Sequence, residues 1–577
     1  MRGSCGPLVL VALFLIAGNA FGSDLRLLRI DGPEAGRLAS MLGHEGFDIV
    51  EGSITPTRFE VITNVDLASQ VQALGLTSTE LGQGGPYVPR SSTVPTSDGA
   101  PLEEDVASPD YARYDDIVAN LQAVAAQYPS IARVVDITTD LGEQATAEGR
   151  DIYGLRISAN VDQRQDEPSV LFVSAQHARE IATPLITLQA IGQLTQGYGV
   201  DATITHLVDS YEIWLVPVWN PDGYEYVFTT EQFWRKNLQS EPATMSVGVD
   251  LNRNYPFDWD GNCPGSLDPN NEEYRGPSAS SEIETQTMEK LSLQERFAKV
   301  LDIHSYGRYV LSGYDCLVHP FAAFLQTEAA AISTAAGYAG AQEVPPADAL
   351  LYENELAQTG AYSFLVETSA EFQPPIDMGI AEAAQVWPGL LYMLERPITI
   401  SGHVFDAQTG IPVAAAISID SVTFSNGETM SSGGLFGRYD LVLPPGAVSL
   451  TFNAPGYFPG HVSFTATATS ADSIDVLLEP KGPTTAGDGG SDAGDGAILS
   501  DANTAGDSTD GNSRDAVDGT RDAAVDIKRE DAVVRQQSGG GCECGVVRDR
   551  PNWRGMILAT AIVLTCVRRR RRINGFR

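Results

Sequence analysis

Apolar, β-rich runs that alternate with helical stretches most constrain the fold of this chain. They fill residues 108–396, which is enough chain for a substantial hydrophobic core. Strands buried on both faces are continuous apolar runs, and the helices between them cover those faces. We therefore expect an α/β domain with a mixed, mostly parallel sheet and helices on both faces. The expected strands cover residues 132–137, 152–157, 170–175, 211–218, 300–303 and 361–366, and the expected helices include 114–127, 184–195 and 280–296.

One smaller domain is expected on each side of this α/β domain in the sequence. Residues 24–83 alternate short apolar runs with helical patterns in the order βαββαβ, which is typical of a ferredoxin-like plait. A linker rich in Gly, Pro, Ser and Thr follows at 84–107. Residues 397–480 show only short strands separated by Gly, Pro and Asn turns, which predicts a small β-sandwich. Its expected strands cover residues 398–405, 414–419, 437–443, 448–454, 461–465 and 473–478.

The two ends of the chain predict export. Residues 1–22 combine Arg2, an apolar run and small residues at the expected cleavage point, as secretory signals do; a buried N-terminal strand or helix is the alternative. Residues 481–541 form an Asp-rich linker that is too poor in apolar residues to fold. Residues 542–577 contain Cys542, a short apolar run and five consecutive arginines, which predicts a sorting or anchoring segment at an extracellular or cell-surface location.

Charge and cysteine usage agree with that prediction. The net charge of -38, much of which lies in the Asp-rich linker, argues against a nucleic-acid partner, because phosphate binding needs Lys and Arg. Only Cys263 and Cys316 lie in the body of the chain. In an oxidising compartment they could form one disulfide, and two buried thiols are the alternative.

Candidate metal ligands lie at the ends of two expected strands. His177 and Glu180 follow the apolar run 170–175, and their spacing of three allows both side chains to face one point. His304 ends the apolar segment that begins at Leu301. Ligands in open α/β sheets bind at the carboxyl ends of strands, and catalytic zinc takes three protein ligands and a water. The pattern predicts one zinc ion at this edge, although His177 and Glu180 alone could be a surface pair.

A candidate general base ends a third expected strand. Glu367 is the last residue of the segment 361–367. Beside a metal that lowers the pKa of water toward ~7, such a carboxylate could accept the proton of that water. A strand-terminal surface residue is the alternative.

Six motifs in order resemble the carboxypeptidase A/B family of zinc metallocarboxypeptidases. The resemblance covers residues 111–394 and includes HARE at 177–180, NPDGYEY at 220–226, FWRK at 233–236, GVDLNRNYP at 248–256, DIHSYG at 302–307 and SFLVE at 363–367. It implies a zinc-dependent hydrolase that removes the C-terminal residue from peptides or proteins with a free C-terminus. His177, Glu180 and His304 would ligate zinc, and Glu367 would be the general base.

The resemblance also implies roles for residues around the metal. Arg235 would stabilise the oxyanion, and Asn252 and Arg253 would hold the terminal carboxylate of the substrate. Arg179 would line the groove beyond them, and Asp250 would orient the first zinc ligand. Residues 343–360 depart from the family pattern. Tyr352 is the candidate there for the tyrosine that closes over the substrate, and a core aromatic is the alternative.

The flanking segments resemble known parts of related proteins. The plait occupies the position of an inhibitory propeptide, the β-sandwich resembles a transthyretin-like domain, and residues 542–577 resemble the sorting tag of exported myxobacterial proteins. Two other functions remain open. The protein could act on cell-wall peptides, or it could be a catalytically inactive surface-binding module.

Overall fold

The computed structural model describes residues 25–482 except 45–46, 66, 91–109, 242–245, 262, 264 and 339–348. The expected signal segment, most of the Asp-rich linker and the sorting segment lie outside these residues. Contacts divide the chain into Met1–Gly487 and Asp488–Arg577, and every described residue belongs to the first unit. Within the described part, helices that combine the length and the apolar character needed to cross a membrane are absent.

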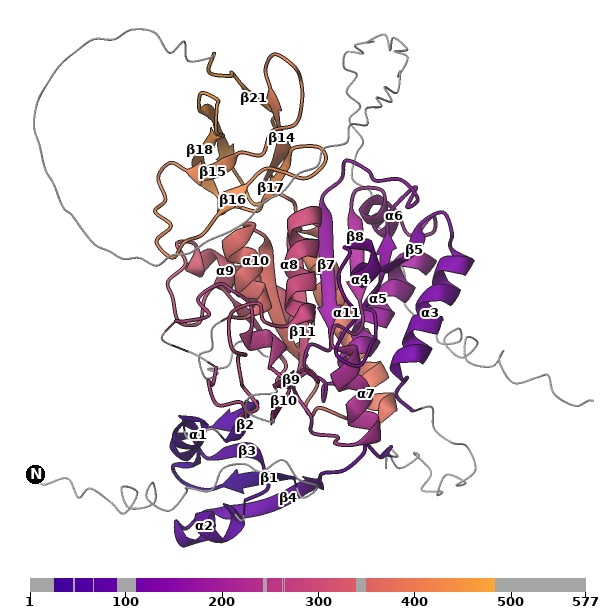
Figure 1. Ribbon diagram of the computed structural model, residues 1–577, viewed down its shortest axis with the longest axis vertical. Helices are drawn as coiled ribbons and strands as arrows, with labels where there is room; N and C mark the ends of the chain where they lie inside the picture. The colour runs from indigo at the N-terminus through magenta and orange to yellow at the C-terminus, as the bar shows by residue number, and fades with distance from the viewer. Residues whose placement is uncertain are drawn as a thin grey trace, which may run out of the picture. The chain divides into compact units, whose positions relative to one another are not determined.

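The central domain is a seven-stranded mixed sheet in the order β12-β13-β11-β7-β8-β6-β5 (Figure 1). The four central strands are parallel, while β5, β6 and β12 join antiparallel. The prediction of an α/β domain with a mixed sheet is therefore confirmed. The strands are β5 (Ala132–Asp136), β6 (Tyr153–Ile157), β7 (Ser169–Ser174), β8 (Glu212–Val216), β11 (Lys299–Ser305), β12 (Tyr309–Ser312) and β13 (Tyr362–Thr368).

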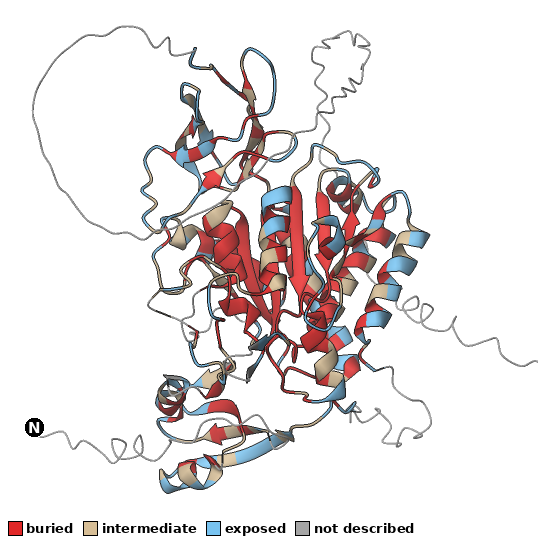
Figure 2. Ribbon diagram, viewed as in Figure 1, coloured by how far each residue is buried: buried red, intermediate tan, exposed pale blue. Residues whose placement is uncertain are grey.

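Helices cover both faces of this sheet because successive strand residues point to opposite sides. Val170 and Phe172 belong to one apolar core with residues of α3, α5, α6, α9 and α11. Leu171 and Val173 belong to a second core with residues of α8 and α10. The strands β7, β11 and β13 are consequently buried along their whole length (Figure 2). The helices are α3 (Tyr114–Gln127), α5 (Thr183–Gly197), α6 (Ala202–Val208), α8 (Ile283–Glu295), α9 (Ala322–Ala335), α10 (Leu351–Gln358) and α11 (Ile376–Glu395).

The N-terminal part forms a four-stranded antiparallel sheet with two helices. Its strand order is β2-β3-β1-β4, and its elements follow one another as βαββαβ. Apolar residues of α1, α2 and the strands form its own core. The elements are β1 (Arg26–Asp31), α1 (Ala35–His44), β2 (Asp48–Thr55), β3 (Arg58–Thr63), α2 (Leu67–Ala73) and β4 (Thr77–Gln83).

The C-terminal described part consists of two small sheets around one core. One sheet has the order β17-β14-β20 with β21 also paired to β14, and the other has the order β16-β15-β18-β19. Ile400 and Tyr439 from the first sheet and Ile417 and Phe452 from the second belong to the same apolar cluster. The strands are β14 (Ile400–Asp406), β15 (Ala416–Ile419), β16 (Met430–Ser431), β17 (Arg438–Leu441), β18 (Gly446–Asn453), β19 (Gly460–Ala466), β20 (Asp472–Ser473) and β21 (Val476–Leu478).

One disulfide joins two loops of the central domain. Cys263 and Cys316 are bonded, with their Cα atoms 5.9 Å apart. Of the two alternatives that the sequence left open for these cysteines, the structure therefore selects the pair.

Candidate metal centre and catalytic residues

The turn between β7 and α5 carries the first two candidate ligands. β7 ends at Ser174, and Ala175 takes a left-handed conformation with φ 52° that turns the chain away from the sheet. Thr183, the first residue of α5, ties this turn together. Its hydroxyl accepts from the Ala175 N–H at 3.1 Å and donates to the Glu180 carbonyl at 2.9 Å. His177 is thereby held in a turn that keeps it close to Glu180.

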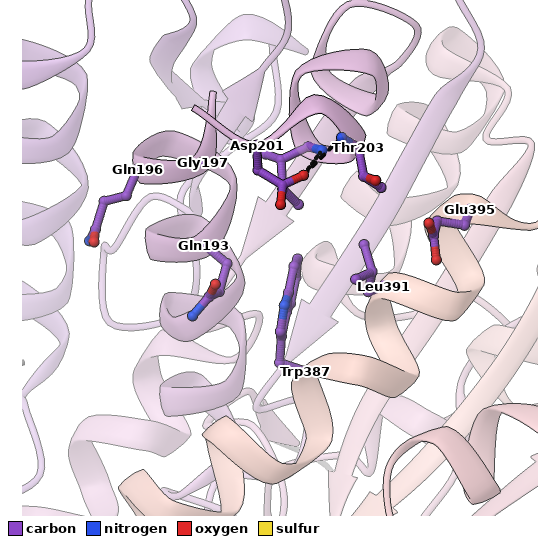
Figure 3. A pocket seen from close by; sticks show the side chains of 9 residues that line it. Gln193, Gln196, Gly197, Asp201, Thr203, Trp387, Leu391 and Glu395 are labelled. Atoms are coloured by element: carbon purple, nitrogen blue, oxygen red, sulfur yellow. Dashed lines mark hydrogen bonds between the residues drawn. The ribbon is translucent and has the colours of Figure 1, made fainter. Parts of the chain in front are cut away.

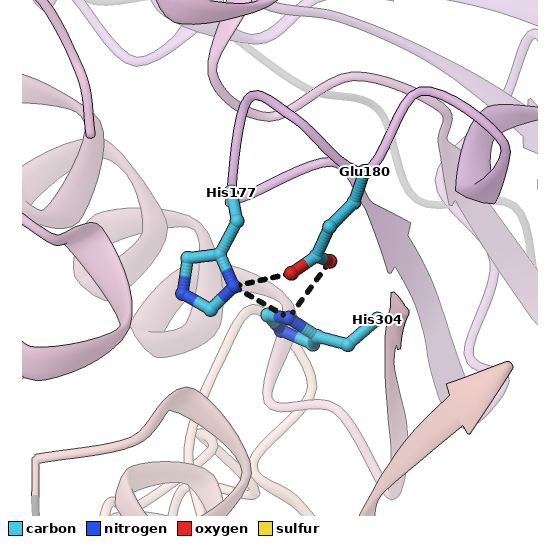
Figure 4. A group of neighbouring side chains, drawn as sticks. All are labelled: His177, Glu180 and His304. Carbon is cyan, nitrogen blue, oxygen red and sulfur yellow. Dashed lines mark hydrogen bonds and ion pairs between the residues drawn. The ribbon is translucent and has the colours of Figure 1, made fainter. Parts of the chain in front are cut away.

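His177, Glu180 and His304 form a buried group that could hold a metal ion (Figure 4). His177 Nδ1 lies 2.7 Å from Glu180 Oε1, and His304 Nδ1 lies 3.2 Å from Glu180 Oε2. The two Nδ1 atoms are 3.1 Å apart. Burial raises the pKa of Glu180, but the adjacent His177 and His304 outweigh burial and lower it. The structure therefore brings together all three predicted ligands.

The far side of each imidazole is held by a carboxylate. His177 Nε2 lies 3.1 Å from Asp250 Oδ1, and His304 Nε2 lies 3.0 Å from Asp302 Oδ1. A ring that donates through Nε2 leaves the lone pair of Nδ1 for a metal. Two such imidazoles and one carboxylate are the donor set of catalytic zinc sites. The residues present therefore fit zinc.

Glu367 lies beside this group because of strand register. On the adjacent parallel strands β11 and β13, His304 and Glu367 are direct partners. Neighbouring strands are about 4.8 Å apart, so the two side chains leave the sheet side by side. Glu367 is buried, with 6% of its surface exposed. This is the position that the sequence predicted for a base next to the metal.

Arg235 is fixed by the same aspartate that supports His177. Its Nε donates to Asp250 Oδ2 at 2.8 Å, while Asp250 Oδ1 faces His177. Burial raises the pKa of Asp250, but Arg235 and His177 outweigh burial and hold it well below its ordinary value. Asp250 is thus ionised, and it sets the positions of a guanidinium and of a metal ligand at once.

Asn252 and Arg253 lie in a short 3-10 helix, Leu251–Arg253, that starts after Asp250. Asn252 Nδ2 lies 3.2 Å from His304 Nε2, and its Oδ1 accepts the Leu351 N–H at 2.8 Å. Arg253 donates to Glu273 Oε1 at 3.2 Å. Asn252 therefore lies beside the candidate ligand His304, and Arg253 follows it in the chain. Their predicted role in binding the terminal carboxylate stays a prediction.

Arg179 does not face an open groove. It is 1% exposed, and it pairs with Asp48 of β2 through Nη1 and, at 2.9 Å, through Nη2. Glu60 of β3 accepts a hydrogen bond from the hydroxyl of Tyr306, two residues beyond His304. Two carboxylates of the N-terminal sheet therefore contact residues that lie within two positions of the candidate metal ligands in the chain.

Tyr352 is not at the surface, contrary to the prediction of a closing tyrosine. It is on α10 with 0% exposure, and it belongs to an apolar cluster with Leu350 and Leu365. Its hydroxyl lies near Asp315 and Glu353. A residue packed against the sheet in this way cannot swing over a substrate. The alternative reading of Tyr352 as a core aromatic matches the structure.

Two positioning residues were missed by sequence reasoning. The first is Asp302, to which the sequence pattern gave no role. Residues two positions apart in a strand lie on the same face, so Asp302 lies on the same face of the sheet as His304. Asp48 is remote in sequence from the motifs and carries no signal of its own. Periodicity could have found the first of these but not the second.

A separate hollow of about 360 Å³ lies at α5, α6 and α11 (Figure 3). It shares no residue with the metal group. Its lining consists of Gln193, Gln196, Gly197, Asp201, Thr203, Ile204, Trp387, Leu391 and Glu395.

Comparison with known proteins points to the same chemistry. Residues 117–385 match the family model described as zinc carboxypeptidase. The chain is 34% identical over 217 residues to metallocarboxypeptidase A of Trichophyton rubrum, which is 36% of this chain and 49% of that protein. It is also 35% identical over 188 residues to an inactive metallocarboxypeptidase of Arthroderma otae, covering 31% of each. The chain thus spans about half or less of the length of these curated relatives.

A solved structure supports the fold. Carboxypeptidase A from Helicoverpa armigera aligns with 64% of this chain and 97% of its own, at a TM-score of 0.52 and 21% sequence identity. Zinc is the metal of the matching family, and the buried His–Glu–His group supplies ligands for it.

Proposed function

We propose that this chain is a zinc metallocarboxypeptidase that hydrolyses the last peptide bond of peptides and proteins. The observation that carries the proposal is the buried group of His177, Glu180 and His304 with Glu367 beside it. Bound there, zinc would supply a Lewis acid that polarises the carbonyl and lowers the pKa of water. Glu367 would accept the proton of the attacking water and pass it to the leaving amine.

Two arginines near the metal group would bind the carbonyl oxygen and the terminal carboxylate of the substrate. Arg235, held by Asp250, would donate to the carbonyl oxygen as negative charge develops on it. Arg253 would bind the terminal carboxylate through its planar guanidinium, and Asn252 would bind beside it. An internal peptide bond offers no carboxylate at that place. The arrangement therefore favours removal of single C-terminal residues.

The test measures amino acids released from a mixed peptide pool, with and without a chelator. We expect release from the wild type, loss of release after zinc removal, and recovery on adding zinc back. Glu367→Gln should lower turnover while leaving zinc binding intact. Asp116→Asn, an exposed change on α3, is the matched control and should have no effect.

Three results would contradict the proposal. Full activity after complete zinc removal would exclude a metal mechanism. Release of internal fragments would exclude an exopeptidase. Zinc binding without any release, in any form of the chain, would favour an inactive surface-binding module; one relative, from Arthroderma otae, is named an inactive metallocarboxypeptidase. Cell-wall peptides belong in the pool, since they also end in carboxylates.

We further propose that residues 24–83 restrain the site as a propeptide would. Support comes from the pairing of Asp48 with Arg179, from the contact of Glu60 with Tyr306, and from Gly52. A Cβ on Gly52 would meet the Tyr306 carbonyl oxygen at 1.8 Å, so the backbones pack closely there.

Limited proteolysis of the linker at 84–107 tests this restraint. We expect the rate of hydrolysis by the full chain to rise after cleavage. Asp48→Asn should raise the uncleaved rate, because it removes the charge that pairs with Arg179. An unchanged rate in both experiments would exclude an inhibitory role.

The termini are proposed to direct export and surface attachment. The signal pattern at 1–22 and the Cys542 segment with its arginines support this. The β-sandwich at 397–480 is proposed to be a transthyretin-like accessory domain. Cell fractionation of a Cys542→Ser variant tests attachment, and retention at the surface despite the change would contradict it.

A further inference from the structure

The hollow at α5, α6 and α11 is lined by polar groups that are free to bind a ligand. The side chains of Gln193, Gln196 and Glu395 are exposed, and within the described part of the chain they form no hydrogen bond or ion pair. Trp387 is half-buried and packs on one side against the main core. Figure 3 shows its ring rising from α11 among these polar side chains. The hollow therefore presents amides and a carboxylate around an indole.

The size of the hollow suits a small molecule or a short stretch of a polymer. Its volume of about 360 Å³ is at the lower end of the range of about 300–1,000 Å³ that is typical of small-molecule sites. A helix of a partner protein is about 10–12 Å across with its side chains, which is more than such a hollow holds.

The charges of the lining favour a neutral ligand. The lining contains the carboxylates of Asp201 and Glu395 and no Lys, Arg or His, so a phosphate or a carboxylate would be repelled. Asp201 Oδ1 already accepts the N–H groups of Thr203 at 2.8 Å and of Ile204 at 3.0 Å. A cation would therefore meet one carboxylate that is engaged at the start of α6, and only Glu395 would remain fully available to it.

A sugar matches each of these groups. One face of a sugar ring consists of C–H groups, which pack flat against the apolar surface of an indole such as Trp387. Its hydroxyl groups both donate and accept hydrogen bonds, as the side-chain amides of Gln193 and Gln196 do. The carboxylate of Glu395 adds a further acceptor. We propose that this hollow binds a neutral sugar unit of a polysaccharide.

The position of the hollow gives the bound sugar a tethering role. Thr183, at the start of α5, supports the turn that carries His177, whereas Gln193 and Gly197 lie at the other end of this helix. The two ends are about 21 Å apart at about 1.5 Å per residue. A sugar in the hollow therefore leaves the metal group open, and the polysaccharide that carries it holds the protein near peptides of the same material.

The test is calorimetric titration of the full chain with the neutral disaccharides cellobiose, maltose, lactose and chitobiose. We expect at least one to bind with a dissociation constant of about 1 mM or lower. Trp387→Ala should raise that constant by about 10-fold or more, because the flat apolar surface is lost. Gln193→Ala should raise it by about 3-fold or more through a lost hydrogen bond. Leu293→Ala also removes an apolar side chain from a helix surface, on α8, and as the matched control it should change nothing.

Thermal unfolding shows which variants are folded, and Gln193→Ala, an exposed change, decides the matter if Trp387→Ala is not. Binding in the presence of a chelator should be unchanged, so failure of the proposed zinc chemistry would leave this measurement intact. Binding of none of the disaccharides would overturn the inference. So would sugar binding that neither variant weakens, or a hollow that takes the cationic probe acetyl-lysine amide in place of the sugars.

Discussion

Asp302 offers a sharp test of how the metal centre is built. Its carboxylate is fully buried and lies 3.0 Å from His304 Nε2. Gln176 Nε2 donates to both of its oxygens, each at 2.8 Å, and Gln176 Oε1 accepts from the Tyr255 hydroxyl at 2.8 Å. Both oxygens of Asp302 therefore accept hydrogen bonds. The Gln176 side chain that donates to them is fixed in orientation by Tyr255.

Asp302→Asn keeps the shape but replaces one of the two acceptor oxygens with an NH2 group. If its oxygen faces His304, its NH2 group faces the NH2 group of Gln176, which is held by Tyr255. If the amide is reversed, the NH2 group of Asn faces His304 Nε2, and that ring nitrogen loses its hydrogen-bond acceptor. The tautomer with the proton on Nε2 and a free lone pair on Nδ1 is then no longer favoured. A lost hydrogen bond to a charged group costs about 1.5–3 kcal/mol. Loss of such a partner typically weakens metal binding by about 10- to 100-fold, which is about 1.4–2.7 kcal/mol.

Chelator competition on the full chain measures the zinc dissociation constant directly. We expect Asp302→Asn to raise it by about 10-fold at least, and exposed Asp116→Asn to leave it unchanged. Asp250→Asn should act similarly through His177. Thermal unfolding without zinc shows whether the fold is retained. An unchanged zinc dissociation constant in folded Asp302→Asn would refute the assignment of Asp302 as the residue that orients His304.

Two further predictions concern binding and stability. Arg253→Ala should raise KM by about 30-fold or more, with a smaller effect on kcat. With a peptide substrate whose C-terminus is amidated, the wild type and the Arg253→Ala variant should have the same KM. Glu284 is the second case: burial and then Glu282 raise its pKa from 4.5 to about 8. Between pH 4.5 and about 8, the Glu284 carboxyl is protonated in the folded state and ionised in the unfolded chain. The free energy of unfolding therefore falls as pH rises through this range, by up to about 1.4 kcal/mol per pH unit. Unfolding of Glu284→Gln should lack this part of the pH dependence, and equal slopes for both proteins would contradict it.

The metal group was predictable because it depends on local pattern. An apolar strand that ends in a histidine places that histidine at the carboxyl edge of the sheet, whatever the rest of the chain does. The same holds for Glu367. Their closeness then follows from strand order, since β7, β11 and β13 are neighbours and parallel.

The parts that sequence reasoning missed depend on contacts between distant segments. Asp48 reaches Arg179 across 131 positions of the chain, and neither residue type specifies the other. Tyr352 lies in a stretch that departs from the carboxypeptidase A/B pattern, and helix periodicity alone could not tell a buried face from a face lining a groove. Its burial is decided by Leu365 and Leu311, which come from two strands that pair antiparallel.

The direction of β12 differs from that of the three strands that carry the metal group and Glu367. The parallel strands β7, β11 and β13 deliver His177, His304 and Glu367 to the same edge. β12 then returns antiparallel, with Tyr309 opposite Glu367 and Ser312 opposite Phe364, so the chain moves away from the metal as it reaches Asp315. Strand polarity therefore separates the candidate metal group from the pair of Asp315 and Glu353 that follows β12, although both lie on segments that meet at the same side of the sheet.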